Sequence, residues 1–541
     1  MSYVILDIET DGFDASVIHC VVCEDHHAEQ RVFYKPDNLQ DYLAQYDLVI
    51  GHNAIQFDFP MLKMMWNITV PAKKQFDTLI GSRLIKPDLE GGHSLEAWGN
   101  RLGFPKLPQP EDWKVFTPEM LEYCKIDVKV CHLLYKEVQL NLKKFSKESI
   151  QSEFMMQRLI NKVRDNGFYF KEQEAVELLE KLETIKAEIR QEIDKVFLPE
   201  TIQLKTKTKE IPFNINSRDQ IAKRLMAIGW KPSVFTPSGK PKVDEIQLGK
   251  FDSRESKIIS EHFTLNKRTA MLKSWIKATE PDFRVRCYYH SLGAVTNRMS
   301  CSDPNLQQVP SNRKIYGEDC RKLWSCPPGN RLIGSDAQGL ELRVLAHYIN
   351  DPEYTREVLE GDVHTANQKA AGLSSRDQAK TFIYALCYGA GDAKLGTVVG
   401  GNAKDGAQLR ASFFDKIPAF RRFSQAVIRK GETQGKLKAI DGRILTVRSP
   451  HASLNTLIQG SSAILMKNWF MNTAMDMKRR NTNGRVIAMV HDEIILESGK
   501  KDVDIVAESV KLGISQVNKQ FDIRCALDCD INFGTNWSEI H

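Results

Sequence analysis

Short apolar runs alternate with helical stretches over the first 145 residues of the chain. Tyr3–Glu9, Val17–Cys23 and Asp47–Gly51 each have the length and the residue types of a strand, and a helix is expected near Phe59–Trp66. Strands that alternate with helices are typical of an α/β domain. The pattern therefore predicts such a domain over residues 1–145, with its first two strands adjacent in one sheet.

Helical spacing dominates after this domain. Residues 148–197 are predicted to be strongly helical, and their run of Glu and Lys is most simply the solvent-exposed face of a long helix. Leu204–Glu210 predicts a short basic linker, and Ser217–Gly229 and Ser256–Lys277 predict two further helices. From about residue 285 the pattern returns to mixed α/β.

One later helix has an unusual polar stripe. In the stretch Arg376–Gly391, Arg376 and Lys380 are followed on one predicted helix, at the same spacing, by Tyr384 and Tyr388. Two cations and two aromatic hydroxyls suit a polyanion that carries a flat ring, such as a nucleoside triphosphate. A solvated amphipathic helix would show the same stripe, so the stripe alone leaves both interpretations open. Two glycines are expected to end the helix.

Composition narrows the class of protein. The 541 residues suffice for roughly three to four domains, and 42% hydrophobic with 27% charged residues is the balance of a soluble globular protein. No apolar run approaches the ~20 residues of a membrane span. The apolar run at the start of the chain is too short, and too soon followed by a charge, to be a signal peptide. Eleven cysteines without a framework spacing suggest free thiols in a reducing cytosol. A net charge of +6 permits nucleic-acid binding without arguing for it.

One cluster of cysteines and histidines suggests zinc at first sight. It consists of His19, Cys20, Cys23, His26 and His27. Its cysteines fall on a predicted strand, where side chains three positions apart point to opposite faces. We therefore interpret the cluster as a buried strand with incidental thiols.

Acidic residues of the first domain form an ordered set. Asp7 and Glu9 are two apart on the first strand, so both project from one face. Asp58 begins a helix, and Tyr123 lies one helical turn before Asp127. Carboxylates from several elements are the ligands that Mg²⁺ or Mn²⁺ requires, and two such ions can promote phosphodiester cleavage. The set resembles the three motifs of the DEDDy 3′→5′ proofreading exonucleases, in which the tyrosine orients the attacking water.

A second acidic set is predicted at strand ends in the later part of the chain. The strand Arg331–Ser335 leads to Asp336, and the apolar runs Val486–Val490 and Ile494–Glu497 predict a hairpin with Asp492 at its turn. The two aspartates would then lie at the ends of neighbouring strands and share two metal ions. Cations on the helix between them would add charge stabilisation for a transferring phosphoryl group.

The strings that contain this second set resemble motifs A, B and C of the family A DNA polymerases. They are GSDAQGLELRVLAHY, RDQAKTFIYALCYGAG and MVHDEIILE. The resemblance continues through Gly293–Pro310, Gly361–Ala371 and Arg448–Gly460 and covers nearly the whole chain. Within the family it is strongest to the replicative polymerases of T-odd bacteriophages.

This resemblance implies an α/β multidomain fold, with an RNase H-like exonuclease domain and a right-hand polymerase of palm, fingers and thumb. The implied function is template-directed extension of a primer with dNTPs by two-metal phosphoryl transfer, with 3′→5′ proofreading, in phage genome replication. The implied boundaries are 1–145 for the exonuclease, 146–290 for the thumb, 291–345 and 436–541 for the palm, and 346–435 for the fingers.

The resemblance also assigns roles around the polymerase metals. Asp336 and Asp492, with the carbonyl of Ala337, would hold two Mg²⁺ ions, for which Mn²⁺ can substitute. Lys380 would also protonate the leaving pyrophosphate. The triphosphate would be held by Arg376, Lys380 and His364.

Further implied roles concern the sugar, the nascent base pair and the DNA. Tyr384 would lie near the sugar, where it is expected to allow ready use of dideoxynucleotides, and Tyr388 near the nascent pair. Glu341 would close the space of a ribose 2′-hydroxyl. The residues expected to contact primer or template are Arg298, Gln459, His491, Asn305 and Gln308.

One departure from the phage pattern affects the expected partners. Leu198–Phe213 leaves no room for the thioredoxin-binding insertion of the T-odd polymerases, so thioredoxin is not expected as a partner. The exonuclease strand starts at Tyr3, so no 5′ nuclease domain is expected. The expected partners are primer–template DNA and dNTPs, with a phage helicase–primase as a further candidate. A monomer in the cytoplasm of an infected bacterium, without membrane attachment, is expected.

Two other functions compete with this interpretation. A single-subunit RNA polymerase shares the helix with Arg, Lys and Tyr, but Glu341 and the exonuclease acids argue against it. A non-catalytic DNA clamp derived from a polymerase is disfavoured by the intact acids of both sets. Incorporation of dNTPs rather than rNTPs, and its dependence on Mg²⁺, distinguish these functions.

Overall fold

The computed structural model describes residues 2–12, 15–203, 208–361 and 363–541, except for the side chains of 202, 363, 364 and 366. The chain forms two compact units. Unit 1 consists of Met1–Asn166, Tyr288–Ser302 and Ile333–Ile531. Unit 2 consists of Gly167–Cys287, Asp303–Leu332 and Asn532–His541.

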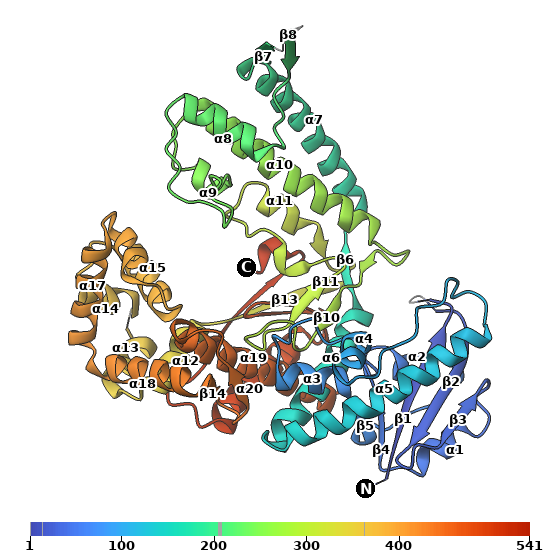
Figure 1. Cartoon of the computed structure of the whole chain (residues 1–541). Helices are drawn as coiled ribbons and strands as arrows, with labels where there is room; N and C mark the ends of the chain where they lie inside the picture. The colour runs from blue at the N-terminus through green and yellow to red at the C-terminus, as the bar shows by residue number, and fades with distance from the viewer. Residues whose placement is uncertain (1, 13–14, 204–207, 362) are drawn as a thin grey trace. The chain divides into compact units, whose positions relative to one another are not determined.

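The first part of unit 1 is a mixed sheet covered by helices. Its strand order is β3-β2-β1-β4-β5, with β1 antiparallel to β2 and parallel to β4. The long helix α5 packs against β1 and β2 (Figure 1). The elements are β1 (Tyr3–Thr10), β2 (Ile18–Asp25), β3 (Gln30–Phe33), α1 (Leu39–Ala44), β4 (Leu48–Gly51), α2 (Asp58–Trp66), β5 (Gln75–Asp77), α3 (Thr78–Ile85), α4 (Leu95–Arg101) and α5 (Pro118–Leu142).

A second sheet carries the later motifs, with the order β16-β17-β13-β18. Helix α19 packs against α20 and α6, and α6 also contacts β16. Trp469 of α19 is buried and donates its indole N–H to the Val510 carbonyl of α20 at 2.9 Å. The elements are α6 (Lys147–Asn166), β10 (Tyr288–His290), β11 (Ser300–Ser302), β13 (Asn330–Ala337), α19 (Ser453–Arg479), β16 (Arg485–Val490), β17 (Glu493–Gly499), α20 (Val503–Gln520) and β18 (Cys529–Gly534).

A run of helices lies between β13 and α19 in the chain. In its central helix, α15, the Ser375 hydroxyl caps the start by accepting from the Gln378 N–H at 3.2 Å. The elements are α12 (Leu340–Ile349), α13 (Pro352–Leu359), α14 (Val363–Ala371), α15 (Arg376–Cys387), α16 (Asp392–Gly396), α17 (Ala403–Lys416), α18 (Pro418–Gln434), β14 (Lys436–Lys438) and β15 (Ile444–Thr446).

Unit 2 combines long helices with the small sheet β12-β6-β9. Trp324 of β12 is fully buried between Phe170 and Trp275, at ring-centroid distances of 4.8 and 5.4 Å. The elements are β6 (Phe168–Phe170), α7 (Glu172–Val196), β7 (Glu200–Gln203), β8 (Thr208–Ile211), α8 (Arg218–Ala227), α9 (Glu245–Leu248), α10 (Arg254–Lys277), β9 (Arg284–Val285), α11 (Gly317–Lys322) and β12 (Trp324–Ser325). Among the helices described in either unit, none is long and apolar enough to cross a membrane.

The predicted strands and helices are found with one difference. Thr208–Ile211 pairs with Glu200–Gln203 as a hairpin, so Leu204–Glu210 is not simply a linker; residues 204–207 lie outside the described part of the chain. The run alternates Lys and Thr without apolar residues between them, so it lacks the apolar–polar alternation that predicts a strand. The stripe helix ends at Cys387, just before the glycines that are predicted to end it: Gly389 has a φ of +75°, and a Cβ there would meet the His451 carbonyl oxygen at 1.9 Å.

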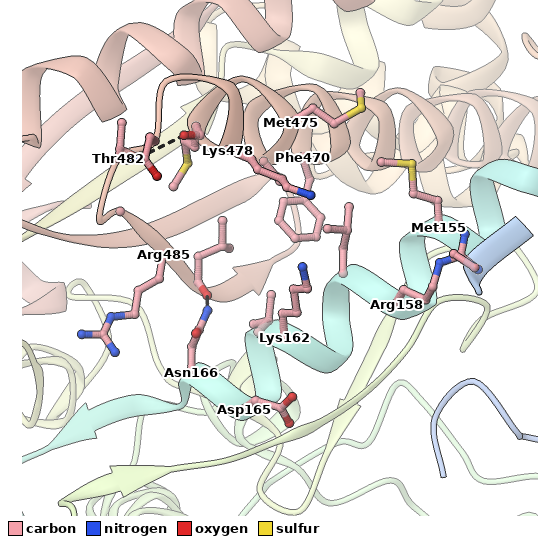
Figure 2. Close-up of a pocket in the computed structure, with 18 residues that line it drawn as sticks. Met155, Arg158, Lys162, Asp165, Asn166, Phe470, Met475, Lys478, Thr482 and Arg485 are labelled. Atoms are coloured by element: carbon pink, nitrogen blue, oxygen red, sulfur yellow. Dashed lines mark hydrogen bonds between the residues drawn. The ribbon is translucent and has the colours of Figure 1, made fainter. Parts of the chain in front are cut away.

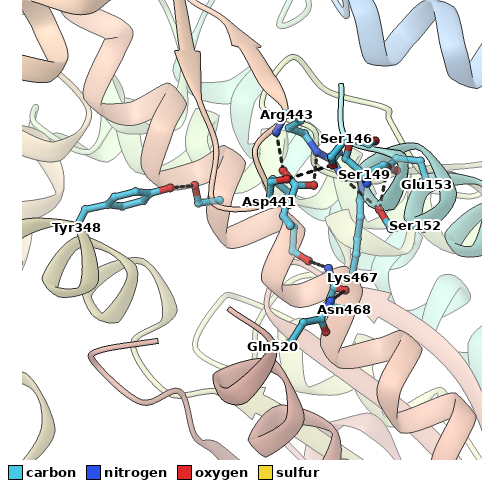
Figure 3. A network of polar contacts seen from close by, with 12 residues as sticks. Ser146, Ser149, Ser152, Glu153, Tyr348, Asp441, Arg443, Lys467, Asn468 and Gln520 are labelled. Atoms are coloured by element: carbon cyan, nitrogen blue, oxygen red, sulfur yellow. Dashed lines mark hydrogen bonds and ion pairs between the residues drawn. The ribbon is translucent and has the colours of Figure 1, made fainter. Parts of the chain in front are cut away.

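A buried ionic network joins three segments of unit 1 (Figure 3). Glu153 of α6 pairs with Arg443 at 2.5 Å and with Lys467 of α19 at 2.9 Å, and Arg443 also pairs with Asp441 at 2.7 Å. Burial raises the pKa of Glu153, but the two cations outweigh it and hold that pKa below its ordinary value. Burial lowers the pKa of Lys467 to about 8. Glu153 is therefore the anion on which two buried cations depend.

We expect Glu153→Gln to lower the free energy of unfolding by about 3–5 kcal/mol, because it leaves the buried Lys467 without its ion-pair partner and Arg443 with Asp441 alone. Urea denaturation followed by tryptophan fluorescence measures this change. Glu148→Gln on the exposed side of the same helix is the matched control and should stay within about 0.5 kcal/mol of wild type. Equal stabilities of the two variants would show that the network contributes nothing.

Candidate active sites

The first acidic set gathers at the carboxyl end of β1. Asp7 and Glu9 project from the same face of this strand, and Cys124 of α5 lies next to them. One potential ligand atom from each of these three residues lies within 4.8 Å of the others. Glu9 and Cys124 are buried, and Asp7 is partly buried. The i, i+2 spacing on the strand therefore produced the pair that the sequence predicts.

Asp58 is positioned by a loop that a second aspartate holds in place. Asp77 ends β5 and caps α3, and its carboxylate also accepts from the N–H groups of Asn53 and Ile55 at 3.1 Å each. These bonds fix the segment that leads from β4 into α2, where Asp58 is the first residue. Asp58 is 4% exposed and is hydrogen-bonded to the backbone of Ile8, the residue between Asp7 and Glu9 on β1.

A lysine that the sequence analysis did not identify completes this site. Lys106 pairs with Asp127, donates to the Tyr123 hydroxyl at 2.7 Å, and lies 4.3 Å from the centroid of the Tyr123 ring. Tyr123 and Asp127 are one turn apart on α5, as predicted. Lys106 comes from the loop between α4 and α5, which has no periodic pattern from which its position follows.

The crowded carboxylates have raised pKa values. Burial, with a contribution from Asp127, raises the pKa of Glu9 to about 9. Burial raises the pKa of Asp58 to about 7 and that of Asp127 to about 6, the latter although Lys106 lowers it. Burial and then the Asp58 charge raise the pKa of Asp7 well above its ordinary value. The single positive charge of Lys106 therefore does not neutralise the four carboxylates of this site.

The donor set fits divalent metal ions. Glu9 Oε1 and Asp127 Oδ1 are buried and have no hydrogen-bond partner within the described part of the chain. Buried carboxylate oxygens without partners are costly, and a hard cation such as Mg²⁺ or Mn²⁺ binds them favourably. The residues that can hold such ions are Asp7, Glu9, Asp58 and Asp127.

We expect Mg²⁺ to stabilise the protein more at pH 8.5 than at pH 6. An acid with a raised folded-state pKa contributes stability below its unfolded pKa of about 4 and loses it as pH rises through the folded pKa, here about 6 to 9. Mg²⁺ binds the ionised form and offsets that loss, by about 2.7 kcal/mol at 100 times its Kd. Thermal melting with Mg²⁺ or EDTA measures the difference.

The double variant Asp7→Asn, Glu9→Gln is the control for this experiment, because it keeps the side-chain shapes and removes two of the charges. It should lose most of the extra Mg²⁺ effect at pH 8.5. An Mg²⁺ increment that is the same at both pH values in wild type would contradict the assignment of these acids as metal ligands.

The second acidic set lies where β13 meets the β16–β17 hairpin. The Ala337 N–H donates to the Asp492 carbonyl at 3.0 Å, and the Ser335 hydroxyl donates to the Ile494 carbonyl at 2.9 Å. Asp336 lies between Ser335 and Ala337 on β13. These bonds bring the backbones of Asp336 and Asp492 to adjacent strand ends, as the sequence predicts.

The hairpin turn consists of His491 and Asp492. Val490 and Glu493 are the last paired residues, and His491 has a φ of +56°. Both turn residues are exposed, whereas Glu493 is buried. A non-glycine residue in the left-handed region costs on the order of 1 kcal/mol, so the turn keeps both side chains at the surface at a cost in stability.

The polar stripe lies on the accessible face of α15. Arg376 and Lys380 are exposed and Tyr384 is half-buried, whereas the opposite face packs Phe382 and Ile383 into the core. Burial, with the charges of Glu341 and Asp492, raises the pKa of Tyr384 to about 12. Tyr384 therefore lies within reach of the charges of Glu341 and Asp492.

Glu341 connects several predicted contact residues. Its carboxylate pairs with Arg298 at 2.5 Å and accepts from the Tyr388 hydroxyl at 2.9 Å. Burial and then Glu341 raise the pKa of Tyr388 to about 12, and a hydrogen bond with Gln459 lowers it in part. Two predicted nucleotide contacts and two predicted primer contacts thus form one network.

Three predicted site residues are not among those that the structure places around the second acidic set and Glu341. The side chain of His364, in α14, lies outside the described part of the structure. Asn305 and Gln308 belong to unit 2, where the Asn305 side chain accepts from the Gln307 N–H at 3.0 Å. Their predicted roles remain predictions.

A cavity of about 700 Å³ in unit 1 lies apart from both acidic sets. It is formed by α6, the end of α19 and the start of β16 (Figure 2). Its lining includes the apolar Phe470 and Met155 and the cationic Arg158, Lys162 and Arg485. None of the predicted site residues lines it.

Comparison with known sequences gives a consistent picture. The sequence profile of DNA polymerase family A matches residues 179–539. The DNA-directed DNA polymerases of Escherichia phage T7 and Enterobacteria phage T3 are 29% and 28% identical, over 99% of this chain and 100% and 99% of theirs. The alignment with the T7 protein has 703 positions, more than the 541 residues here, so that protein has segments that this chain lacks.

Bacterial proteins and a solved structure extend the comparison. DNA polymerase I of Aquifex aeolicus is 26% identical over 87% of this chain and 84% of its own length. The polymerase domain of Pol1 from M. smegmatis, solved in complex with DNA primer-template and dNTP, has a TM-score of 0.83. It is 16% identical, over 99% of this chain and 96% of that one. The TM-score therefore shows that the two chains share a fold.

Proposed function

The chain belongs to DNA polymerase family A, and from this premise we propose that this DNA-directed DNA polymerase extends a primer with dNTPs and proofreads the new 3′ end by 3′→5′ hydrolysis. The observation that carries the polymerase proposal is the hydrogen bond from the Ala337 N–H to the Asp492 carbonyl at 3.0 Å. It brings the backbones of Asp336 and Asp492 to adjacent positions. After burial and the charge of Glu341, the charge of Asp492 contributes to the raised pKa of Tyr384 on α15. The similarity to phage polymerases along the whole chain supports a role in phage genome replication, in the cytoplasm of an infected bacterium.

In this proposal the second acidic set holds the metal ions and the cations of α15 hold the triphosphate. Asp336, Asp492 and the Ala337 carbonyl hold two Mg²⁺ ions, or Mn²⁺ in their place. Arg376 and Lys380 bind the triphosphate on the exposed face of α15, and Lys380 gives a proton to the departing pyrophosphate. Metal ions bound at these acids neutralise charge that develops on the transferring phosphoryl group.

The contacts with sugar, base pair and DNA follow from the Glu341 network. Glu341 lies beside Tyr388 and Arg298, where it fills the space that a ribose 2′-hydroxyl would need. Arg298 and Gln459 would contact minor-groove acceptors that every correct base pair presents, so they test geometry rather than sequence. His491 at the hairpin turn would contact the primer-terminal phosphate, Asn305 and Gln308 the template, and His364 the triphosphate.

The exonuclease proposal rests on the first acidic set. Asp7, Glu9, Asp58 and Asp127 hold the ions, and Tyr123 orients the attacking water. Lys106 fixes the Tyr123 hydroxyl through its 2.7 Å hydrogen bond. The orphaned oxygens of Glu9 and Asp127 support this proposal, because they have no partner among the described residues.

Primer extension with dNTPs or rNTPs tests the polymerase proposal. We expect Mg²⁺-dependent extension with dNTPs and little with rNTPs. Glu341→Ala should increase rNTP use, because it opens the space beside the sugar. Equal use of both nucleotides by wild type would contradict the role of Glu341, and DNA retention without Mg²⁺-dependent synthesis would indicate a clamp. Added thioredoxin should leave product lengths unchanged, since only residues 197–217 separate α7 from α8.

Tyr384 is expected to permit the use of dideoxynucleotides. Its hydroxyl lies near the proposed sugar position and offers a polar contact in place of the missing 3′-hydroxyl. Loss of a hydrogen bond worth about 1.4 kcal/mol weakens binding about tenfold. Tyr384→Phe should therefore raise discrimination against ddNTPs at least about tenfold. Chain-termination assays measure this ratio, with Tyr348→Phe as the control. Strong discrimination by wild type would contradict the placement of Tyr384.

A further inference from the structure

The cavity formed by α6, the end of α19 and the start of β16 has no task in the proposed synthesis or digestion. Its volume of about 700 Å³ is within the range of small-ligand sites. All three of these elements belong to unit 1, and none of the acids of either set lines the cavity. The cavity is therefore a candidate site for a ligand of its own.

The charged lining of this cavity is strongly unbalanced. Four cations line it against one acid, Asp165, which pairs with the neighbouring Arg164 at 2.9 Å. Among these cations only Arg485 has a carboxylate partner in the described part of the chain, which is Glu497 at 3.2 Å. The other three are Arg158, Lys162 and Lys478. An excess of positive charge around one concave space attracts an anion.

Arg158 shows most clearly that a counter-charge is missing. Its side chain is partly buried, and burial lowers the pKa of its guanidinium below the ordinary value. Its one hydrogen bond within the described residues is a long contact with Gln75 Oε1 at 3.4 Å. A charge that is removed from water without a counter-charge is costly. An anion beside Arg158 would recover part of that cost.

Two lysines extend into the same space from two different helices. Figure 2 shows the side chains of Lys162, from α6, and Lys478, from α19, in the cavity. Neither ammonium group has a hydrogen bond or an ion pair with another described residue. Like charges in one space repel each other. A phosphate monoester carries about two negative charges, so it would remove this repulsion and accept a charge-assisted hydrogen bond from each lysine.

The uncharged lining favours a flat aromatic body attached to this anion. Met155 and Met475 line the cavity, and Met475 is 48% exposed although most of α19 is buried. Thioethers make favourable contacts with aromatic rings, and cations bind over ring faces. Asn481 and Thr482 add polar groups that can contact a ring edge. A ring with polar edges joined to a phosphate is the chemistry of a nucleotide.

We propose that the cavity between α6 and α19 binds a nucleoside monophosphate. Arg158, Lys162 and Lys478 hold the phosphate, and the base contacts Met155 and Met475. Binding does not require Mg²⁺, because the acids of both metal sites lie outside the cavity. The site is independent of the proposed synthesis and digestion. A ligand bound there connects α6 with α19 and stabilises the folded protein.

Equilibrium dialysis of the full-length protein with dAMP in EDTA tests the site, because EDTA removes the metal ions on which both proposed active sites depend. We expect wild type to bind one equivalent of dAMP, and to bind inorganic phosphate or deoxyadenosine at least about tenfold more weakly. The charge variant Lys162→Gln, Lys478→Gln should bind dAMP at least about tenfold more weakly than wild type. The control Lys143→Gln, Lys147→Gln removes two exposed lysines of the same unit outside the cavity and should bind like wild type.

A variant that fills the cavity without changing its charge separates the cavity from the surface around it. Ala474 lines the cavity on α19, so Ala474→Trp should bind dAMP at least about tenfold more weakly although every cation remains. Urea denaturation checks the fold of each variant. Ala474→Leu, which fills less space, repeats the test if Ala474→Trp misfolds.

Absence of dAMP binding in wild type, or equal affinity of wild type and the charge variant, would overturn the site. Binding that is lost in the charge variant but kept by the folded cavity-filling variant would place the anion on the surface and overturn the cavity. Inorganic phosphate bound as tightly as dAMP would overturn the choice of a nucleotide. Primer extension and digestion are not read out in this experiment, so its failure is distinguishable from failure of the proposed function.

Discussion

Asp336→Ala is expected to reduce primer extension by at least about 10³-fold, or about 4 kcal/mol of transition-state stabilisation. The reason is that Asp336 and Asp492 end adjacent strands, so neither carboxylate can hold both ions alone. Digestion of single-stranded DNA should continue at the wild-type rate, because the acids proposed for it lie on β1 of the other sheet and on the helices α2 and α5. Single-turnover extension and digestion assays with one labelled oligonucleotide measure both activities.

The control for this variant is Asp415→Ala, which removes an exposed carboxylate of α17. It should retain both activities. Loss of both activities in Asp336→Ala would show that the two sites are not independent, and full synthesis by that variant would show that the polymerase metals are bound elsewhere.

Asp7→Ala should have the converse effect, with at least a 10³-fold loss of digestion and normal primer extension. Asp7 is surrounded by three further acids, and burial and their charges raise its pKa well above its ordinary value. Its removal relieves that repulsion in the metal-free protein, so the lost activity should not come with a lower melting temperature. Digestion assays and thermal melting in EDTA test the two parts together.

Asp41→Ala, in the exposed first turn of α1, is the matched control and should digest DNA normally. Persistent digestion by Asp7→Ala would mean that the exonuclease metals are misassigned. Lost digestion together with a strongly lowered melting temperature would instead indicate a structural role for Asp7.

Local periodicity made much of the fold predictable. The Asp7 and Glu9 pair follows from alternation on a strand, and the Tyr123 and Asp127 pair from one turn of a helix. The hairpin with Asp492 at its turn follows from two apolar runs with two residues between the last paired positions. The motifs then identified the family, which the sequence profile over residues 179–539 confirmed.

Contacts between distant segments could not be predicted in this way. Lys106 reaches Asp127 from a loop without periodicity, and Glu153 meets Arg443 and Lys467 about 300 residues later. These features arise from tertiary packing, which propensity and spacing do not specify.

The most direct test of two separate sites is product-length analysis on a primer–template with a mismatched 3′ end, in the presence of dNTPs and Mg²⁺. We predict that wild type first shortens the primer and then extends it to full length. Asp7→Ala should leave the mismatched primer largely unextended, and Asp336→Ala should shorten it without resynthesis. If wild type left the mismatch in place, or if Asp7→Ala removed it at the wild-type rate, the account of a polymerase with its own proofreading site would be contradicted.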